Sequence, residues 1–526
     1  MTNDVAGDRP ATTADCLRHW ARERPDHPAL RWAGGQLTYA QLDERTNRLA
    51  QALASAGVGA GDRVAYLDKN SPEQIELFFA AGKLNAVPCP VNYRLAPPEV
   101  AYIVSDSEAK VFAVGEEFVP AVRKVASDLP DQVVVIGGAD GDWPAFGPWR
   151  DAHDPVDPRV PVSAGDIACQ LYSSGTTGRP KGVELTQANV GCDRELYHMA
   201  MGLGPDSVNI VPMPLYHIGG SGWAMAGFWQ GATNVLVREI VPEQLVDTMV
   251  AERVTHGFIV PAVIQFMLAV PGVEERDWSA LEAVLYGASP ISETVLAKAM
   301  KTFRCRFVQA YGLTESTGTV IYLPAEAHDP DGPNRHRLRA CGIPIPGHEA
   351  RIVDPITGED QPDGQVGEIW VRGPSVMAGY WHMPEQTAEV IRPGGWLRTG
   401  DAGYRDEDGY FYIHDRVKDM IVSGGENVYP AEVENVIMSH PDVADVAVIG
   451  VPHERWGETP RAMVVRAAGS DLTEEALLGY CRERLAGYKC PTSVQWLEEL
   501  PRNPSGKVLK KDLRAPFWEG RTRMVG

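Results

Sequence analysis

The amino-acid sequence predicts an α/β protein with a large N-terminal domain of several subdomains and a small α+β C-terminal domain. Two observations support this fold class. Short apolar runs typical of strands alternate with helical patterns along the chain, which favours largely parallel α/β layers plus a β-rich unit. The length of 526 residues also exceeds what one hydrophobic core normally supports, so we expect two or more domains.

The individual elements follow from these local patterns. The helical pattern is clearest over 72–84, and the connection over 137–162 is rich in Gly, Pro and Asp. The best strand candidates of the N-terminal part are 63–67, 110–114, 132–136, 166–171, 234–237 and 281–286.

The clearest domain boundary falls near Asp415 to Lys418, which predicts domains at 1–415 and 416–526. Upstream, residues 354–412 have the short strands and turns of a β-rich unit. Its best strands are 367–371 and 409–413. Downstream, we expect a helix over 431–439, a strand over 443–449 and a helix over 474–485, which together predict the small α+β domain.

Composition limits the function classes. An apolar fraction of 44% and a charged fraction of 23% are ordinary for a soluble globular protein. The net charge of −21 argues against a nucleic-acid partner, because the phosphate backbone would be repelled. Residues 1–10 lack the apolar core of a signal peptide, and no run approaches the ~20 apolar residues of a membrane-spanning helix, so we expect a cytoplasmic protein. The eight cysteines form no CxxC pair, which favours free thiols over disulfides or zinc.

Residues 172–182, read Tyr-Ser-Ser-Gly-Thr-Thr-Gly-Arg-Pro-Lys-Gly, predict a phosphate-binding loop. Glycines let the backbone N–H groups approach an anion, hydroxyls add donors, and Lys181 adds a positive charge. The strand at 166–171 would place this loop at a strand's carboxyl end, where α/β sheets bind ligands. It is not a Walker A loop, which needs a Gly-Lys-Ser/Thr run. The alternative is a solvated surface turn. The candidate phosphate ligands are Ser173, Ser174, Gly175, Thr176, Thr177 and Lys181.

A second motif is Gln309-Ala310-Tyr311-Gly312-Leu313-Thr314-Glu315. An aromatic face suits a purine, and a carboxylate beside a polyphosphate is the usual ligand of Mg²⁺. The structural alternative makes Tyr311 a core aromatic and Glu315 a surface charge. The run Tyr286-Gly287-Ala288-Ser289-Pro290 follows a candidate strand and predicts an adenine-side turn, although turns of this composition are common.

Two further motifs lie in the C-terminal part of the chain. Trp396-Leu397-Arg398-Thr399-Gly400-Asp401 ends in a carboxylate at a turn, and Arg416 follows after a hairpin. A carboxylate that accepts two vicinal hydroxyls is a common ribose contact, whereas the alternative for Asp401 is a turn former. Pro501-Arg502-Asn503-Pro504-Ser505-Gly506-Lys507 presents a lysine that can neutralise a carboxylate and a phosphate together, although a lone lysine is usually solvated.

From about Thr38 to Lys510, these motifs resemble in order those of the adenylate-forming superfamily, which includes acyl-CoA synthetases, luciferases and peptide-synthetase adenylation domains. The resemblance implies that Tyr311 stacks on adenine, Thr314 contacts phosphate and Glu315 holds Mg²⁺. It also implies a ribose pair of Asp401 and Arg416, a mobile C-terminal lid with its hinge at Lys418, and catalysis by Lys507, His217, Thr177 and Glu315. The further ATP contacts that it implies are Gly287, Ala288, Ser289, Gln309, Gly312 and Ile413.

The chemistry implied is a two-step activation of a carboxylic acid. The acid attacks the α-phosphate of ATP to give acyl-AMP and pyrophosphate, and a thiol then displaces AMP. No side-chain nucleophile is required, and the chain shows no GxSxG elbow. The loop with Ser423, Gly424, Gly425 and Glu426 is expected to line the path of the CoA pantetheine arm after the lid rotates. A weaker hypothesis places CoA phosphates on the basic tail around Lys510 and Lys511, where a solvated charged face is the alternative.

The identity of the acid depends on the acyl pocket, for which we predict His217, Trp223, Tyr286 and Gly312. Amino-acid-activating members of the superfamily carry an aspartate near this position to pair the substrate ammonium. The stretch 216–223 contains no acidic residue, so the resemblance disfavours an α-amino acid. An apolar cavity suits a fatty or an aromatic acid, and the local strings look most like bacterial fatty-acid–CoA ligases. A structural, hydrogen-bonded histidine is the alternative for His217.

Several alternatives stay open. They are an aromatic-acid–CoA ligase and an acyl-AMP ligase that passes the acyl group to a carrier-protein pantetheine or another nucleophile. The chain shows no obvious insertion typical of acyl-AMP ligases, which favours CoA. A luciferase-like oxygenase and a non-catalytic nucleotide-binding scaffold fit the motifs less well. The sequence also leaves open whether the chain is a monomer or a homodimer.

Overall fold

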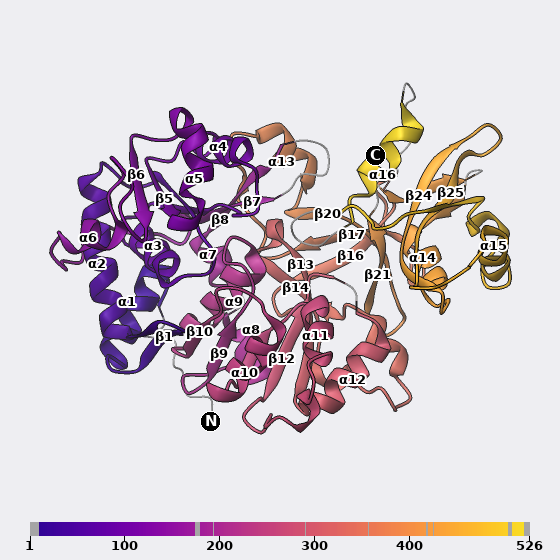
Figure 1. Cartoon of the computed structure of the whole chain (residues 1–526), viewed down its shortest axis with the longest axis horizontal. Helices are drawn as coiled ribbons and strands as arrows, with labels where there is room; N and C mark the ends of the chain where they lie inside the picture. The colour runs from indigo at the N-terminus through magenta and orange to yellow at the C-terminus, as the bar shows by residue number, and fades with distance from the viewer. Residues whose placement is uncertain are drawn as a thin grey trace. The chain divides into compact units, whose positions relative to one another are not determined.

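The computed structural model describes residues 10–173, 179–192, 194–289, 291–355, 357–416, 419–423, 426–502 and 508–519. The chain divides into two compact units (Figure 1). Unit 1 contains Met1–Glu349 and Val371–Leu397, and unit 2 contains Ala350–Trp370 and Arg398–Gly526. The mixed α/β architecture confirms the predicted fold class.

The division differs from the predicted boundary at 415/416, because the β-rich segment groups with the C-terminal part of the chain. The physical reason is a small buried cluster within unit 2. Ala402 packs there with Met420 and Tyr429, and Val366 lies against them. These apolar contacts join residues from both sides of the predicted boundary.

A four-stranded parallel sheet forms the N-terminal layer of unit 1. Alternation along its strands explains how both of its faces are covered. Val64 and Tyr66 pack in one core with α2 and α3, whereas Ala65 and Leu67 pack in another with α4 and α5. In spatial order the strands are β4 (Val87–Pro90), β3 (Arg63–Leu67), β5 (Val111–Gly115) and β6 (Gln132–Ile136), and the helices are α2 (Tyr39–Ser55), α3 (Pro72–Lys83), α4 (Pro97–Asp106), α5 (Val119–Val122) and α6 (Phe146–Asp151).

The second layer of unit 1 is a nine-stranded sheet in the described part of the chain. Its central strands are parallel, and the strands at its two ends are antiparallel. Its order is β15 (Ile343–Pro344), β14 (Gly318–Leu323), β13 (Arg306–Leu313), β12 (Ala283–Gly287), β11 (His256–Phe258), β9 (Val208–Val211), β10 (Thr233–Leu236), β1 (Pro28–Trp32) and β2 (Gly35–Thr38).

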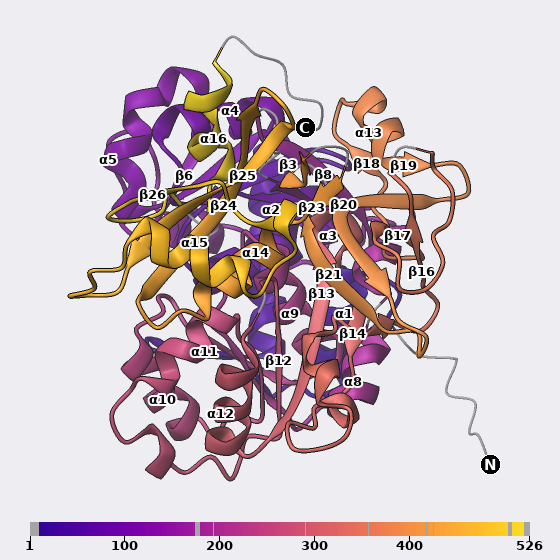
Figure 2. The same ribbon diagram turned by 90° about the vertical axis from the view of Figure 1, so that its right-hand side faces the viewer.

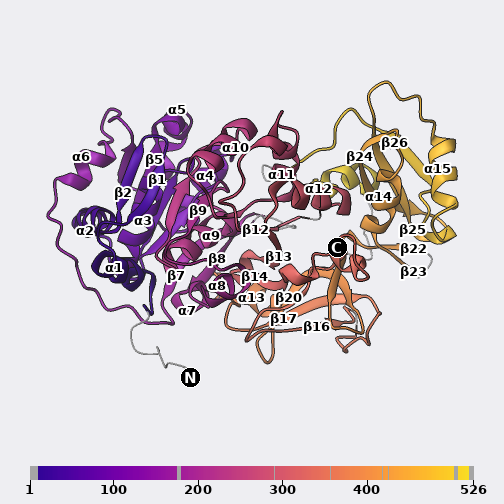
Figure 3. The ribbon, with the colours of Figure 1, turned by 90° about the horizontal axis from the view of Figure 1, so that it is seen from below.

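Helices cover both faces of the nine-stranded sheet. One face packs against α10 (Pro242–Ala251), α11 (Pro261–Leu268) and α12 (Glu293–Phe303), which lie in a row in Figure 3. The other face packs against α1 (Thr13–Glu23), α8 (Arg194–Met201) and α9 (Ile218–Trp229). Alternate residues of one strand therefore belong to different cores, as Leu285 and Tyr286 of β12 do.

A small antiparallel sheet completes unit 1 and carries the predicted phosphate loop. Its order is β18 (Gly379–Tyr380), β8 (Lys181–Thr186) and β7 (Ile167–Ser173). The short helices α7 (Gln187–Val190) and α13 (Pro384–Val390) adjoin it in the chain. β7 ends at Ser173, so the predicted loop follows the carboxyl end of a strand, as expected. β7 and β8 form an antiparallel hairpin whose ends meet at the Ser173–Lys181 pair.

Unit 2 contains most of a β-rich sheet and a separate C-terminal sheet. The former has the order β16 (Glu349–Val353), β17 (Gly367–Arg372), β20 (Trp396–Arg405) and β19 (Ile391–Arg392), with β21 (Phe411–Arg416) also paired to β20. The C-terminal sheet has the order β23 (Glu426–Val428), β22 (Ile421–Ser423), β25 (Gly457–Arg466) and β24 (Val443–His453), with β26 (Ser493–Trp496) also paired to β25.

The C-terminal sheet is covered on both faces. Its long β24–β25 hairpin, visible in Figure 2, packs one face against α14 (Pro430–Met438) and α15 (Glu474–Arg482). The other face packs against α16 (Lys510–Trp518) through Leu513. These elements confirm the helix–strand–helix pattern predicted at 431–439, 443–449 and 474–485.

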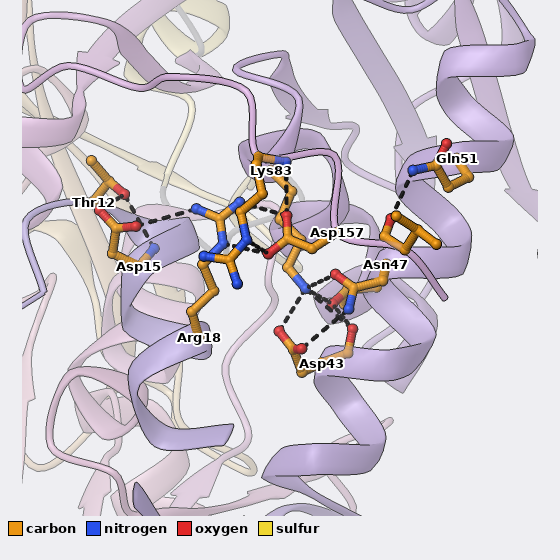
Figure 4. Close-up of polar contacts among 11 residues, drawn as sticks. Thr12, Asp15, Arg18, Asp43, Asn47, Gln51, Lys83 and Asp157 are labelled. Atoms are coloured by element: carbon orange, nitrogen blue, oxygen red, sulfur yellow. Dashed lines mark hydrogen bonds and ion pairs between the residues drawn. The ribbon is translucent and has the colours of Figure 1, made fainter. Parts of the chain in front are cut away.

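A polar network holds the chain that leads into the phosphate hairpin (Figure 4). Arg18 of α1 donates two hydrogen bonds of 2.8 Å to the carboxylate of Asp157. Gln51 of α2 donates to the backbone oxygen of Val156 at 2.7 Å. The connection before β7 is thus tied to two helices rather than left as a loose linker.

Among the described residues, no helix has both the length and the apolar content needed to cross a membrane.

Candidate active site

The described end of the phosphate hairpin presents Ser173 and Lys181. The predicted ligands Ser174, Gly175, Thr176 and Thr177 lie outside the described residues. Ser173 ends β7 and Lys181 begins β8, so the two face each other across the mouth of the hairpin. A hydroxyl and an ammonium can both donate hydrogen bonds to a phosphate.

Glu315, the residue predicted to hold Mg²⁺, lies beside this hairpin. It sits in a single 3₁₀ turn, Thr314–Ser316, between β13 and β14. The hydroxyl of Ser173 donates to Oε1 of Glu315 at 3.2 Å, and the phenol of Tyr380 donates to the same oxygen at 2.9 Å. The structure therefore brings together the phosphate hairpin and the carboxylate predicted to hold Mg²⁺, although 142 positions separate Ser173 from Glu315.

The segment before Tyr380 fixes the turn that carries Glu315. The backbone N–H of Met377 donates to the backbone oxygen of Glu315 at 3.0 Å, and the hydroxyl of Thr317 donates to the oxygen of Ser375 at 2.6 Å. Thr317 has a φ of 54°, a left-handed conformation that costs energy for a β-branched residue. Its hydroxyl bond helps to offset that cost, so the turn is held at two points.

The residues predicted for the adenine side lie where β12 ends beside β13. Gly287 pairs with Ala310, and a Cβ on Gly287 would collide with the Ala310 oxygen. Ala288 follows with a φ of 65°. The absence of a side chain at Gly287 therefore lets the strand end approach its neighbour. Gln309, Tyr311 and Gly312 lie on β13, Thr314 begins the adjoining turn, and Ser289 follows Ala288 in the chain.

A cavity that is open to solvent adjoins this turn. Gly312, Thr317 and Gly318 contribute to its wall, so the β13–β14 connection supplies both the Glu315 carboxylate and part of the cavity. The other lining residues are mainly apolar: Tyr197, His217, Ile218, Gly219, Gly222, Trp223, Phe258, Leu285, Ala288, Ala310 and Thr319. Three of the four predicted acyl-pocket residues, His217, Trp223 and Gly312, line this cavity.

Tyr286 is the exception, and we correct its assignment. Its ring is fully buried among the residues that pack against α10–α12, and its hydroxyl donates to Nε2 of His328 at 3.0 Å. Strand alternation explains the error, since Leu285 rather than Tyr286 points to the cavity side of β12.

His217 lies at the N-terminus of α9, where its Nδ1 accepts the backbone N–H of Gly219 at 3.1 Å. That bond leaves the proton of the neutral ring on Nε2. Trp223, one turn and a half further along α9, is fixed by a bond from its indole N–H to the Ile210 oxygen at 3.0 Å. The ring of Trp223 meets Tyr197 edge-on with centroids 5.5 Å apart, so this part of the cavity wall is rigid and aromatic.

Unit 2 carries the remaining predicted nucleotide and CoA residues. Asp401 lies within β20 rather than at a turn, and its backbone pairs with that of Arg416 on β21. Ile413 is exposed on β21, and Ser423 pairs with Glu426 in the β22–β23 hairpin. Lys418, Gly424, Gly425 and Lys507 lie outside the described residues.

The basic tail is partly neutralised within unit 2. Lys510 forms an ion pair of 2.8 Å with Glu434, and Arg514 forms one of 2.8 Å with Asp419. Both basic side chains are mostly buried. These contacts weaken the hypothesis that this cluster binds CoA phosphates.

Sequence reasoning missed Tyr380. It lies 65 positions after Glu315 and reaches it because β18 pairs with β8, so no local spacing signalled the contact. Among the described residues, no three His, Cys, Asp or Glu side chains gather into a metal site. A single carboxylate nevertheless fits Mg²⁺, which usually takes one or two carboxylates together with substrate phosphates and water.

The fold and this arrangement define a two-part nucleotide-dependent enzyme, and comparison with known proteins gives its family. The family model described as AMP-binding enzyme matches residues 17–381, and the model described as AMP-binding enzyme C-terminal domain matches residues 432–507. The chain belongs to this adenylate-forming family of AMP-binding enzymes, as predicted, and is an AMP-forming acid–thiol ligase.

Individual relatives match almost end to end. A fatty acid–[acyl-carrier-protein] ligase, ScoC, of Streptomyces coeruleorubidus is 40% identical over 511 residues, covering 96% of each chain. A feruloyl-CoA synthase of an Amycolatopsis species is 40% identical over 498 residues, covering 94% of this chain and 97% of the relative. The crystal structure of ATP-bound MatB from Rhodopseudomonas palustris superimposes with a TM-score of 0.87 at 31% identity, covering 96% of this chain and 99% of that one.

Proposed function

We propose that this enzyme activates a carboxylic acid, with a fatty acid as the first candidate, to acyl-AMP and transfers the acyl group to the thiol of CoA. The observation that carries the proposal is the position of Glu315. Its carboxylate lies beside the phosphate hairpin, and the residues on either side of it, Gly312 and Thr317, line the apolar cavity. An acid held in the cavity would present its carboxylate next to the polyphosphate site.

In the first step, an oxygen of the substrate carboxylate forms a bond to the α-phosphorus of ATP, and the bond from that phosphorus to the pyrophosphate oxygen breaks. Ser173, Lys181 and the hairpin align and neutralise the phosphates. Glu315 would hold Mg²⁺, which supplies further charge neutralisation when bound. From the resemblance of their motifs, Lys507 is assigned to neutralising the substrate carboxylate and the α-phosphate as they approach each other. Asp401 and Arg416 are assigned to binding the ribose.

In the second step, the thiol sulfur of CoA bonds to the acyl carbon, the bond from that carbon to the AMP oxygen breaks, and the thiol proton is released. Ser423, Gly424, Gly425 and Glu426 are assigned to the pantetheine path, and Lys418 to a hinge between two arrangements of the lid. His217 lines the cavity and is assigned to orienting the acyl carboxylate.

A second candidate substrate class is an aromatic acid. Three aromatic side chains, Tyr197, Trp223 and Phe258, line the cavity and contact one another, which suits a planar ring. The relatives include a feruloyl-CoA synthase as well as a fatty-acid ligase. The fatty-acid relative, ScoC, is named as a ligase for an acyl-carrier protein. The pantetheine thiol of a carrier protein is therefore the second candidate acceptor. A cytoplasmic location and a homodimer remain proposals.

The test is a panel of acids from short to long fatty acids together with benzoate and cinnamate types. Pyrophosphate release and thioester formation are measured with CoA, with a holo-carrier protein and with neither. Acid-dependent pyrophosphate release with a CoA thioester supports the proposal and identifies the acid class. A thioester on the carrier protein alone would replace CoA as the acceptor, and pyrophosphate release that no acid increases would contradict acid activation.

A further inference from the structure

Tyr380 contacts two oppositely charged groups with different parts of one side chain. Its hydroxyl donates to Oε1 of Glu315 at 2.9 Å. Its ring lies under the ammonium of Lys181, with Nζ 4.7 Å from the ring centroid. All three residues belong to unit 1, so their geometry does not depend on how the two units are placed.

The two oxygens of Glu315 are not equivalent. The hydroxyls of Tyr380 and Ser173 both donate to Oε1, at 2.9 and 3.2 Å. Within the described residues, the structure records no donor to Oε2. The carboxylate is half-buried rather than freely rotating in solvent. Two donors on one oxygen fix the rotation of the group and leave the second oxygen as the available ligand.

Lys181 is held by the ring rather than by a carboxylate. In the part of the chain that the structure describes, no ion pair joins it to Glu315. A cation over an aromatic face is attracted to it without losing its charge. The lysine and the carboxylate therefore both remain available to a phosphate and a cation instead of neutralising each other.

The position of Tyr380 is itself well determined. It pairs with Val183 in the β18–β8 ladder, and its backbone N–H donates to the hydroxyl of Thr387 at 2.9 Å. Its side chain is 8% exposed. The strand pairing and the backbone hydrogen bond therefore fix the place from which the side chain of Tyr380 reaches Glu315.

We propose that Tyr380 is a positioning residue that turns Glu315 so that Oε2 faces a divalent cation bound with the nucleotide. Its ring meanwhile keeps Lys181 apart from that carboxylate. The proposal rests on the proposed role of Glu315 in the nucleotide site. It adds a residue and an orientation that the motifs did not contain.

The test separates the hydroxyl from the ring. Tyr380→Phe keeps the ring under Lys181 and removes the donor, whereas Tyr380→Leu removes both. The matched control is Tyr412→Phe in unit 2, which removes a comparable 3.0 Å phenol–carboxylate bond, to Asp406. Mn²⁺ binding to the full-length protein with ATP is measured from the EPR signal of free Mn²⁺, and ATP binding in EDTA is measured by calorimetry.

For Tyr380→Phe we expect Mn²⁺ affinity to fall about tenfold, with ATP affinity in EDTA and the unfolding temperature unchanged. For Tyr380→Leu we expect ATP affinity in EDTA to fall as well, by about threefold. Tyr412→Phe should change neither. Unchanged Mn²⁺ affinity in Tyr380→Phe would overturn the proposal, and so would a wild-type protein whose ATP binding is indifferent to the metal.

Pyrophosphate exchange then separates this proposal from the proposed function. If Mn²⁺ binding depends on the Tyr380 hydroxyl but no acid stimulates exchange, the positioning role stands and acid activation fails. If exchange is acid-dependent and Tyr380→Phe has wild-type metal affinity, acid activation stands and the positioning role of Tyr380 fails.

Discussion

The ammonium of Lys83 lies 2.7 Å from Oδ1 of Asp43, and the lysine side chain has no solvent-exposed surface. The same nitrogen donates to the hydroxyl of Thr46 at 2.8 Å and to Oδ1 of Asn47 at 2.5 Å (Figure 4). Lys83 ends α3, and its three partners lie on α2. A buried lysine whose donors are all used joins two helices of the N-terminal layer.

We expect Lys83→Met to lower the free energy of unfolding by about 3–5 kcal/mol, because Asp43 and Asn47 lose the cation that compensates their burial. The matched control is Lys110→Met, which breaks an ion pair of 2.8 Å with Asp62. The Lys110 side chain is 48% exposed, so the control should cost about 1 kcal/mol or less. Thermal unfolding of both variants measures the difference. Equal losses would show that burial does not strengthen the Lys83 pair.

The Tyr286–His328 contact predicts a pH dependence of stability. His328 is almost fully buried, and burial lowers its pKa from 6.5 to about 4. Its Nδ1 donates to the Pro324 oxygen and its Nε2 accepts from Tyr286, which requires the neutral ring. Between these pKa values the unfolded chain binds a proton that the folded chain does not. Stability should therefore fall from pH 6.5 towards pH 4, by about 3 kcal/mol in total.

Urea unfolding at pH 7.5, 6.0 and 5.0 measures this loss. His328→Gln should be less stable than wild type at pH 7.5 but should lose less stability on acidification, because the proton-binding difference is gone. His382→Gln, at an exposed position, is the control and should keep the wild-type slope. An unchanged slope in His328→Gln would assign the acid sensitivity to other groups.

Two glycines of α9 predict opposite outcomes for the same substitution. A Cβ on Gly222 would meet only Ile218, at 3.6 Å, and would project into the cavity wall. A Cβ on Gly220 would collide with the backbone oxygen of Pro214. We expect Gly222→Ala to fold normally, since alanine favours a helix by about 1 kcal/mol, and to lower kcat/KM about tenfold for the bulkiest acids accepted.

Gly220→Ala should instead lower the unfolding temperature and the yield of folded protein. The comparison uses circular dichroism for folding and the acid panel for selectivity. If Gly222→Ala left the rank order of acids unchanged, the cavity would not be the acyl site.

Local patterns predicted the elements well where sequence and packing agree. The strands at 63–67 and 132–136 match β3 and β6, because apolar runs in a parallel sheet are buried on both faces. The motif at 172–182 predicted a loop after a strand, and β7 and β8 flank it. The antiparallel pairing of these two strands was not predicted, because strand pairing depends on the tertiary structure. Tyr286 was placed on the wrong face of β12 because this strand is buried on both faces. Its residues do not alternate between apolar and polar, so the sequence does not show which of them face the cavity.

The least predictable contacts join distant segments. The local sequence shows Lys83 only as a lysine at the end of a helix. Its contact with Asp43 arises from the packing of α3 against α2. Tyr380 likewise depends on a two-residue strand that pairs with β8. In both cases the side chain's role is set by partners more than 30 positions away, as the Lys83–Asp43 separation of 40 illustrates.

Glu315→Gln tests the charge in the candidate site without changing its shape. The glutamine oxygen can accept the same bonds from Ser173 and Tyr380, so the change removes the negative charge and replaces the second carboxylate oxygen with an NH₂ group. We expect acid-dependent pyrophosphate exchange to fall about 10²–10³-fold, and ATP affinity in EDTA to stay within about twofold of wild type. Glu326→Gln, an exposed position after β14, is the matched control and should be neutral. A Glu315→Gln enzyme with wild-type Mg²⁺ dependence would place the metal elsewhere, because a neutral amide is a far weaker ligand for a divalent cation than a carboxylate.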